Sequence, residues 1–254
     1  MVEHSSAQYS TPRSRDGSIR RLALIVGFAP IVLFALGCDS RWLLERGVDG
    51  QVWSNLAGPI YFALLLGGLR PEQRLMVLIF VPFSALGEYL FSLVFGLYSY
   101  KFGAVPLYVP FGHAILFGTG LLLAELPLVT SDPRRTRLLL GFFHAALFAG
   151  ALLLYGDTLS ALFGAVFIWL MRRKGSPPLY LIMGVLVLYI ELVGTAFGCW
   201  VWAPRPLGLL HTTNPPVGAF VCYVIADVIV IRLAGLLAPY IATIPGILSR
   251  DRHR

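Results

Sequence analysis

The chain consists of long apolar runs separated by short polar segments that carry arginine or lysine. A helix needs about 20 apolar residues to cross the hydrocarbon core of a bilayer, and about 17 to 25 are tolerated. Backbone polar groups inside a bilayer must be hydrogen-bonded within the chain, which continuous apolar runs achieve as helices. The sequence therefore predicts an all-α, polytopic membrane helix bundle. About eight transmembrane helices are expected, at 22–38, 52–69, 75–97, 104–126, 138–155, 158–171, 178–198 and 215–237.

The composition agrees with this fold class and excludes a soluble domain. Hydrophobic residues make up 57% of the chain and charged residues only 13%, whereas about a quarter of the residues of soluble domains are charged. The net charge of +7 could indicate a nucleic-acid-binding protein, but the basic residues lie between the apolar runs instead of forming one patch. We therefore predict the lipid bilayer as a partner and no nucleic acid.

The distribution of the basic residues predicts the orientation of the chain. If the N-terminus is inside, the inner segments carry 15 of the 20 Lys and Arg residues and the outer loops carry four, with Arg232 in the last helix. Such an excess of basic residues marks cytoplasmic segments. We therefore predict a multi-pass protein of the cell inner (plasma) membrane with both termini in the cytoplasm.

The two ends of the chain differ from the apolar region between them. Residues 1–21 are polar and basic, which indicates a disordered tail, and residues 22–237 form the predicted transmembrane bundle. Residues 238–254 are expected to be an interfacial segment followed by a basic tail, because the apolar part is too short to span a bilayer. The first apolar run lacks a small-residue cleavage site, so we expect a retained helix and not a signal peptide.

One local pattern occurs in both halves of the chain: a glutamate, a glycine, two large aromatic residues separated by one position, and a Pro-x-Gly step. Interfacial aromatic residues and helix-initial prolines are common, but neither tendency explains matched glutamates. With eight helices both copies run from inside to outside, which favours four-plus-four parallel repeats at about 22–130 and 138–237. The corresponding residues are Glu88 and Glu191, Gly96 and Gly198, Tyr98-x-Tyr100 and Trp200-x-Trp202, and Pro110-x-Gly112 and Pro216-x-Gly218.

Four ionisable side chains fall in one layer of the predicted bilayer. At 1.5 Å per residue, Glu88 and His113 lie about 14 Å from the outer ends of their helices, Glu191 about 10 Å and Asp227 about 18 Å. A charge at the bilayer centre costs about 2.5 kcal/mol or more, so such residues usually face a bundle interior and mark a functional site. These four are our candidate catalytic residues, and we expect at least one acid to be neutral and able to donate a proton.

Aromatic and amide side chains close to this layer are the candidate substrate-binding groups. Electron-rich rings can stabilise a cation that forms on a substrate. The sequence shows no metal-binding pattern and no cofactor motif, so we predict neither a metal nor a cofactor. The substrate-binding candidates are Tyr98, Tyr100, Trp200, Trp202, Asn214 and Tyr223.

Several candidates have a structural alternative. Glu88 and His113 could form a structural pair across a helical hairpin. Asp227 could bond Tyr223 and nearby backbone, and Asn214 could cap the last helix.

Other polar residues are expected to be structural. Asp157 and His211 are placed at the outer surface, and His144 is expected to be a satisfied core histidine. Cys38 and Cys199 fall at outer helix ends, where either a disulfide or two free thiols would fit.

The first of the two matched stretches resembles the polytopic membrane carotenoid-biosynthesis family, whose members hydrate terminal double bonds of carotenoids. Those proteins carry a glutamate followed by G-x-Y-x-Y and a V-P-x-x-x-P step. The resemblance covers about 30 residues and departs from the family at His113. It implies an enzyme that acts on an isoprenoid. The matching residues are Glu88, Gly96, Tyr98, Tyr100, Val105, Pro106 and Pro110.

Three functional hypotheses follow. The first is an intramembrane acid–base enzyme that hydrates, cyclises or isomerises a double bond of an isoprenoid or other lipid-soluble small molecule. In it Glu88 is the general acid, His113 relays its proton, and Glu191 and Asp227 form a second acid–base pair. The second hypothesis is a proton-coupled transporter with these acids as the relay, and the third is a non-catalytic membrane partner protein. A closed, aromatic-lined cavity that opens sideways to lipid would favour the enzyme, and a central polar cavity that faces one aqueous side would favour transport.

Overall fold

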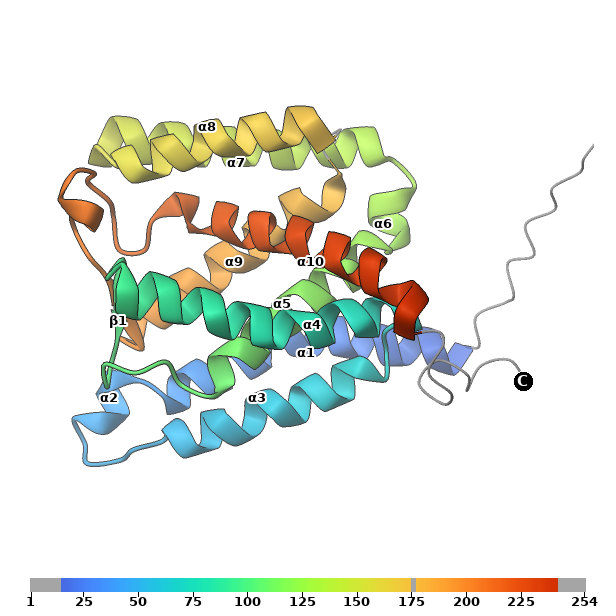
Figure 1. Ribbon diagram of the computed structural model, residues 1–254, viewed down its shortest axis with the longest axis horizontal. Coiled ribbons are helices and arrows are strands. Elements are labelled where there is room, and N and C mark those ends of the chain that lie inside the picture. Colours follow the sequence, from blue (N-terminus) through green and yellow to red (C-terminus); the bar gives the residue numbers. More distant parts are fainter. Residues whose placement is uncertain (1–14, 175–176, 242–254) are drawn as a thin grey trace, which may run out of the picture.

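The computed structural model describes residues 15–174 and 177–241, and this part of the chain folds as an all-α bundle (Figure 1). Within the described residues, eight helices of 16 to 24 residues run between the two ends of the bundle. They are α1 (Arg15–Cys38), α3 (Gln51–Leu66), α4 (Pro71–Glu88), α5 (Tyr108–Ala124), α7 (Pro133–Tyr155), α8 (Thr158–Lys174), α9 (Pro178–Ala196) and α10 (Phe220–Ile241).

Five helical segments of the described chain are long and apolar enough to cross a membrane. They lie in α1, in α4 with the π-helix η1 (Tyr89–Val94) that continues it, and in α7, α9 and α10. Helix α5 is a shorter apolar helix of 17 residues, and α3 and α8 have 16 and 17 residues. The helical membrane bundle agrees with the prediction, whereas eight spans remain a prediction.

The first and last helices extend beyond their expected limits. Helix α1 begins at Arg15, inside the segment expected to be a disordered tail. Two arginines near the start of α1 hold it against the bundle. Arg20 donates to the Leu64 carbonyl, and Arg21 bonds Glu125. Helix α10 continues to Ile241, into the segment expected to be interfacial. The rest of the two expected tails, 1–14 and 242–254, lies outside the described residues.

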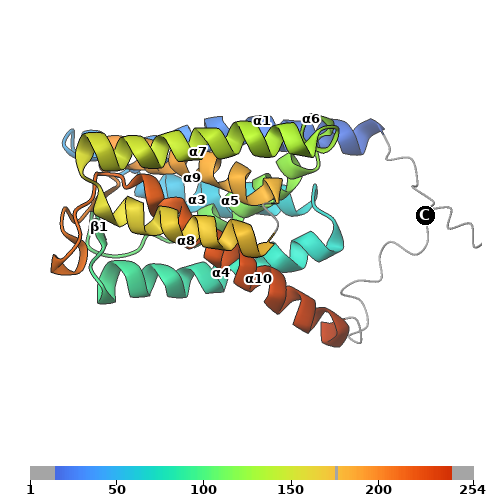
Figure 2. The ribbon, with the colours of Figure 1, turned by 90° about the horizontal axis from the view of Figure 1, so that it is seen from above.

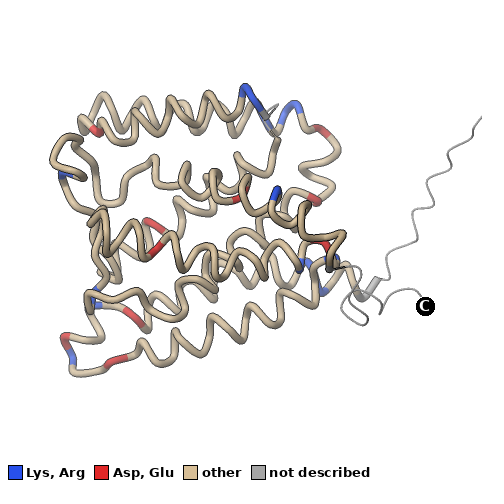
Figure 3. Tube along the Cα trace, in the orientation of Figure 1, with Lys and Arg blue, Asp and Glu red and all other residues tan. Residues whose placement is uncertain are grey.

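The two ends of the bundle carry different short elements. We call the end with the two strands the loop end and the opposite end the basic end. Figure 3 shows Lys and Arg gathered at the basic end, where α7 begins and α8 ends. The short helix α6 (Pro127–Thr130) lies at the basic end. The loop end holds α2 (Arg41–Leu44), β1 (Tyr98–Tyr100), β2 (Trp200–Trp202) and the 3₁₀ helices η2 (Pro206–Gly208) and η3 (Val217–Ala219).

Helices α5 and α9 form the centre of the bundle and pack against each other. Every residue of α5 from Ala114 to Gly120 is buried. A Cβ atom at Gly120 would lie 2.5 Å from Met183 Sδ, so glycine permits the close approach of the two helices. Helices α7 and α8 form a hairpin along one side of this core (Figures 1 and 2).

The two aromatic doublets form a two-stranded antiparallel sheet, which the sequence did not predict. Tyr98 pairs with Trp202, and Tyr100 pairs with Trp200. The strands have three residues each, too few for a reliable period-two pattern. Their pairing joins the loop that follows η1 to the loop that follows α9.

A buried ion pair holds the loop end together. Lys101 Nζ lies 2.9 Å from Asp39 Oδ1, and both side chains are almost completely buried. The Tyr108 hydroxyl donates to Asp39 Oδ2 at 2.8 Å, and Gln51 Nε2 donates to Oδ1 at 3.0 Å. Asp39 therefore connects the end of α1 to β1, α3 and α5. The sequence analysis missed this pair because Asp39 and Lys101 lie in expected outer loops.

A second cluster holds the basic end. Glu125 bonds Arg21 at 2.9 Å and Arg70 at 2.6 Å, and it accepts a hydrogen bond from Gln73 Nε2 at 2.8 Å. The cluster connects α1, α4 and α5, so both ends of the first half of the bundle are fixed by polar contacts.

All three cysteines, which lie in the described part of the chain, are free thiols. The disulfide between Cys38 and Cys199 is therefore not formed. The Cys199 thiol donates to the Leu36 carbonyl at 3.3 Å. Burial, followed by the charge of Asp39, raises the pKa of Cys199 to about 12.

We predict that Lys101→Ala destabilises the protein by about 3–5 kcal/mol, because removing one partner leaves a buried charge unpaired. Thermal unfolding in mild detergent would measure the loss. Asp39→Asn/Lys101→Met removes both charges and should recover part of the stability. Arg205→Ala removes an exposed basic residue from the same end and serves as the control. Equal stability of Lys101→Ala and Arg205→Ala would show that the ion pair does not hold this end.

Candidate functional site

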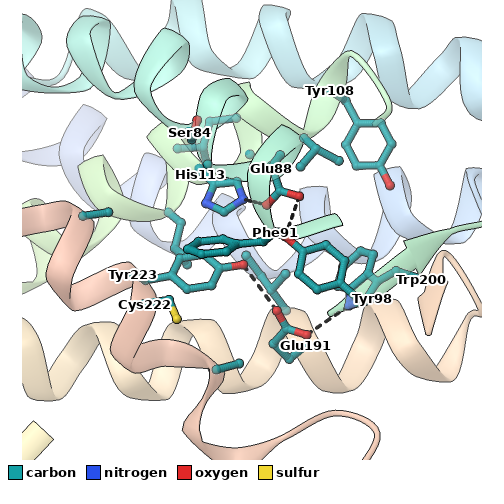
Figure 4. Close-up of a pocket in the computed structure, with 18 of the residues that line it drawn as sticks. Ser84, Glu88, Phe91, Tyr98, Tyr108, His113, Glu191, Trp200, Cys222 and Tyr223 are labelled. Atoms are coloured by element: carbon teal, nitrogen blue, oxygen red, sulfur yellow. Dashed lines mark hydrogen bonds and ion pairs between the residues drawn. The ribbon is translucent and has the colours of Figure 1, made fainter. Parts of the chain in front are cut away.

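A cavity of about 160 Å³ lies between α1, α4, α5, α9, α10 and the two strands (Figure 4). Its lining is mostly apolar, and it contains two carboxyl groups, those of Glu88 and Glu191. The structure thus brings together three of the four catalytic candidates, Glu88, His113 and Glu191. The aromatic rings of the lining are Phe28, Phe80, Phe83, Phe91, Tyr98, Tyr100, Tyr108, His113, Phe163, Trp200, Trp202 and Tyr223.

Glu88 ends α4, is 4% exposed, and is held by three side chains. The hydroxyl groups of Tyr98 and Tyr100 donate to its Oε2 at 2.8 and 2.5 Å. The His113 Nε2 lies 2.7 Å from Oε1. Burial, followed by the charge of Glu88, raises the pKa of Tyr100 well above that of a free phenol. The Tyr100 hydroxyl therefore remains a donor to Glu88.

Glu191 in α9 is 3% exposed and has an equivalent set of partners. The indole Nε1 atoms of Trp200 and Trp202 both donate to its Oε2 at 3.0 Å. The Tyr223 hydroxyl donates to Oε1 at 3.3 Å, from α10. Each glutamate thus uses one oxygen for an aromatic doublet and the other for a side chain of the helix that follows.

Local backbone geometry aims each doublet at its own glutamate. Gly96 and Gly198 precede the strands with φ of 59° and 69°, a left-handed conformation that turns the chain back over the helix end. Side chains at i and i+2 of a strand point to the same side. Both rings of each doublet are accordingly buried, while the middle residue, Ser99 or Val201, is exposed. The π-helix η1 begins directly after Glu88, and such turns are frequent at functional sites.

Ring contacts join the two glutamate sites into one. The Tyr98 and Trp202 ring centroids lie 4.7 Å apart across the sheet. The imidazole of His113 stacks on the ring of Tyr223, with 4.7 Å between centroids and 12° between planes. Figure 4 shows Glu88 of α4, His113 of α5, Glu191 of α9 and Tyr223 of α10 facing one space, with Tyr98 and Trp200 of the strands beside them.

The partners give the two glutamates different proton chemistry. An indole N–H can only donate, so Oε2 of Glu191 acts only as an acceptor. An imidazole nitrogen can donate or accept, according to its tautomer, so one proton can lie on either side of the 2.7 Å contact between Glu88 and His113. The contact between Glu88 and His113 is therefore the place in this site where a proton can change sides.

Asp227 does not join this site. It is completely buried in α10, and neither carboxyl oxygen has a hydrogen-bond partner among the described residues. The expected bond to Tyr223 is absent, because the Tyr223 hydroxyl lies on Glu191. The expected pair of Glu191 with Asp227 is likewise not formed. One turn of α10 separates Tyr223 from Asp227, and helical spacing could not tell which acid the tyrosine contacts.

Asn214 lies beside a strand instead of at the start of the last helix. Its Oδ1 accepts the backbone N–H of Trp202 at 3.1 Å, so it holds β2 and does not cap α10. It is also absent from the cavity lining, among the residues that the structure describes.

Two other polar residues differ from expectation. Asp157 is completely buried instead of lying at the surface. Its Oδ2 accepts bonds from the hydroxyls of Ser160 at 2.8 Å and Thr213 at 2.8 Å, which fold the loop before α10 over the start of α8. His144 is buried as expected and contacts the Leu140 carbonyl through Nδ1 at 2.6 Å, but its Nε2 has no partner among the described residues.

The comparisons with known proteins gave no match: no family model, no curated protein and no solved structure is similar to this chain.

We predict that Gly194→Val displaces the Trp200 ring from Glu191. A Cβ atom at this position would lie 2.0 Å from the ring, and overpacking of this kind costs about 1–3 kcal/mol. Near-ultraviolet circular dichroism and thermal unfolding would report both effects. Gly235→Val in α10, where a Cβ atom would meet nothing within 4 Å, is the matched control. Spectra and stabilities that do not differ between the two variants would refute the placement of Trp200.

Proposed function

We propose that this protein is an intramembrane acid–base enzyme that acts on a double bond of an isoprenoid or another lipid-soluble substrate. The observation that supports this most is two buried glutamates, each with three hydrogen-bonding partners, on one apolar and aromatic-lined cavity. A polar solute would lose its hydration in such a cavity without adequate replacement. An apolar substrate would not.

The size of the cavity suits part of a long substrate. A dry apolar cavity of about 150 Å³ holds a benzene-sized molecule, and this one measures about 160 Å³. It therefore accommodates one end group of an isoprenoid, and the rest of the chain extends into lipid. We place its exit along α4 and η1, where the lining residues Phe83, Gly87 and Phe91 are only partly buried.

The two glutamates have different roles in this proposal. Glu88 and His113 hold the transferable proton, because theirs is the contact at which a proton can move between two groups. Glu191 is the fixed acceptor, which stabilises positive charge on the substrate together with the ring faces of Trp200 and Trp202. This division replaces the expected pair of Glu191 and Asp227.

The chemical step needs no cofactor. The O–H bond of Glu88 breaks as its proton forms a C–H bond with one alkene carbon, and the other carbon becomes a cation. Attack by water gives hydration, attack by a second double bond gives cyclisation, and loss of a neighbouring proton gives isomerisation. In each case one proton leaves the substrate or the water and returns to Glu88 through His113, so the enzyme is restored. The resemblance to the carotenoid-biosynthesis family supports hydration among these outcomes.

We extend the proposal to the architecture. Eight spans in four-plus-four parallel repeats, with both termini in the cytoplasm of an inner-membrane protein, would place α4 and α9 in equivalent positions. The equivalent partner sets of Glu88 and Glu191 support this arrangement, as does the antiparallel pairing of β1 with β2. The equivalence of the two halves is approximate, because His113 follows Pro110 by three residues whereas Tyr223 follows Pro216 by seven.

Lipid profiling of cells with and without the protein tests the function. We predict that Glu88→Gln lowers substrate conversion by at least about 10²–10⁴-fold, the usual contribution of a general acid. Glu191→Gln should also lower it strongly, because the cation loses its counter-charge. Glu72→Gln, which changes an exposed glutamate at the start of α4, is the control and should convert normally.

Other outcomes would assign another function. Full conversion by both glutamine variants, in protein that inserts normally, would refute the catalytic roles. Uptake of a solute into vesicles that depends on pH, without any chemical conversion, would favour the transporter. Neither conversion nor uptake would favour a non-catalytic membrane partner.

A further inference from the structure

A second cavity, of about 740 Å³, forms a groove between α7 and α8. In the described part of the chain it shares no lining residue with the cavity around Glu88. Leu181 of α9 contributes to its lining. The groove therefore belongs to the outer hairpin of the bundle and is independent of the proposed active site.

Small residues leave the groove open. Gly141, Ala145 and Ala149 line it at four-residue spacing along α7. A Cβ atom at Gly141 would meet nothing within 4 Å. From Arg137 to Leu152 the groove runs about 22 Å at 1.5 Å per residue, and the hydrocarbon of one leaflet is about 15 Å thick. The groove is therefore long enough to hold one acyl chain of a phospholipid.

Arginines line the groove at the basic end only. Arg134 and Arg137 come from α7 and Arg172 comes from α8, and Figure 3 shows both of these helix ends at the basic end of the bundle. Arg134 and Arg172 are exposed, and Arg137 is half-buried. None of the three forms an ion pair with a described residue. The groove thus has positive charge at one end, where a lipid headgroup would bind, and an apolar lining along the rest, where an acyl chain would lie.

We infer that this groove binds an anionic phospholipid, with its phosphate between Arg134, Arg137 and Arg172 and one acyl chain along α7 toward Leu152. Arginine binds phosphate through paired, charge-assisted hydrogen bonds. Basic pockets between membrane helices bind anionic headgroups in this way. The position of the arginines fixes the direction of the lipid, with the headgroup at the basic end.

The charge of the groove favours an anionic lipid over a helix from a second copy of the chain. A second copy in the same membrane would have the same orientation, so its own basic end would lie beside these arginines. Like charges at such short range repel each other. An anionic headgroup instead neutralises the three arginines.

Native mass spectrometry of the full chain in mild detergent tests this site, with phosphatidylglycerol and phosphatidylcholine added in equal amounts. We predict preferential retention of phosphatidylglycerol. In Arg137→Gln/Arg172→Gln its affinity should fall about 30-fold, because each basic residue near an anionic lipid contributes about five-fold. Arg135→Gln/Arg173→Gln removes the same charge from neighbouring positions outside the groove and should bind nearly as the unchanged protein does.

A second pair of variants tests the acyl-chain part. Gly141→Leu places a side chain in the groove and should abolish retention. Gly150→Leu lies on the same helix, also in open space but outside the groove lining, and should retain the lipid. Thermal unfolding of both variants confirms that they are folded.

Four results would overturn the proposal. They are equal retention of the two lipids, an equal loss in the Arg135→Gln/Arg173→Gln control, retention that survives Gly141→Leu, and a dimer that Gly141→Leu dissociates. The last would assign the groove to a second copy of the chain. None of these measurements depends on conversion of an isoprenoid, so this proposal and the proposed enzyme can fail separately.

Discussion

The carboxyl groups of Glu88 and Glu191 are buried in an apolar bundle, and two short strands supply most of the hydrogen bonds that they accept. Tyr98 and Tyr100 of β1 donate to Glu88, and Trp200 and Trp202 of β2 donate to Glu191. An uncompensated charge at this depth would cost several kcal/mol. The pairing of β1 with β2 therefore permits both acids to remain in the bundle, and it also places them on one cavity.

The paired strands are themselves held in place by polar contacts at the loop end. The strands can hold the rings on the acids only if their own positions are constrained. Lys101 follows β1 and is bound to Asp39 at the end of α1, while Asn214 accepts the backbone N–H of Trp202 in β2. Buried polar contacts at one end of the bundle thus position the groups that we assign to catalysis in its interior.

The sequence could predict what depends on composition and local spacing. Apolar runs indicated the helices, and the matched patterns singled out both glutamates and both aromatic doublets. The equal expected depth of Glu88 and His113 indicated that these two side chains could pair. It could not predict contacts that depend on tertiary packing. The strands are too short to recognise, and the Asp39–Lys101 pair joins positions far apart in the chain. Tyr223 was expected to bond Asp227, one turn away, and instead bonds Glu191 of another helix. Asp157 was expected at the surface because a charged residue in a short loop usually contacts water. Here it is buried, and the hydroxyls of Ser160 and Thr213 donate to its carboxyl group.

The central claim is that Glu88 delivers a proton to a carbon atom of a lipid-soluble substrate. Its most direct test is mass spectrometry of the product that the purified protein forms from a linear isoprenoid polyene in D₂O. The account predicts one carbon-bound deuterium for each protonation by Glu88, that is, one in each turnover, because the proton on Glu88 exchanges with solvent through His113. Conversion without carbon-bound deuterium would contradict the account.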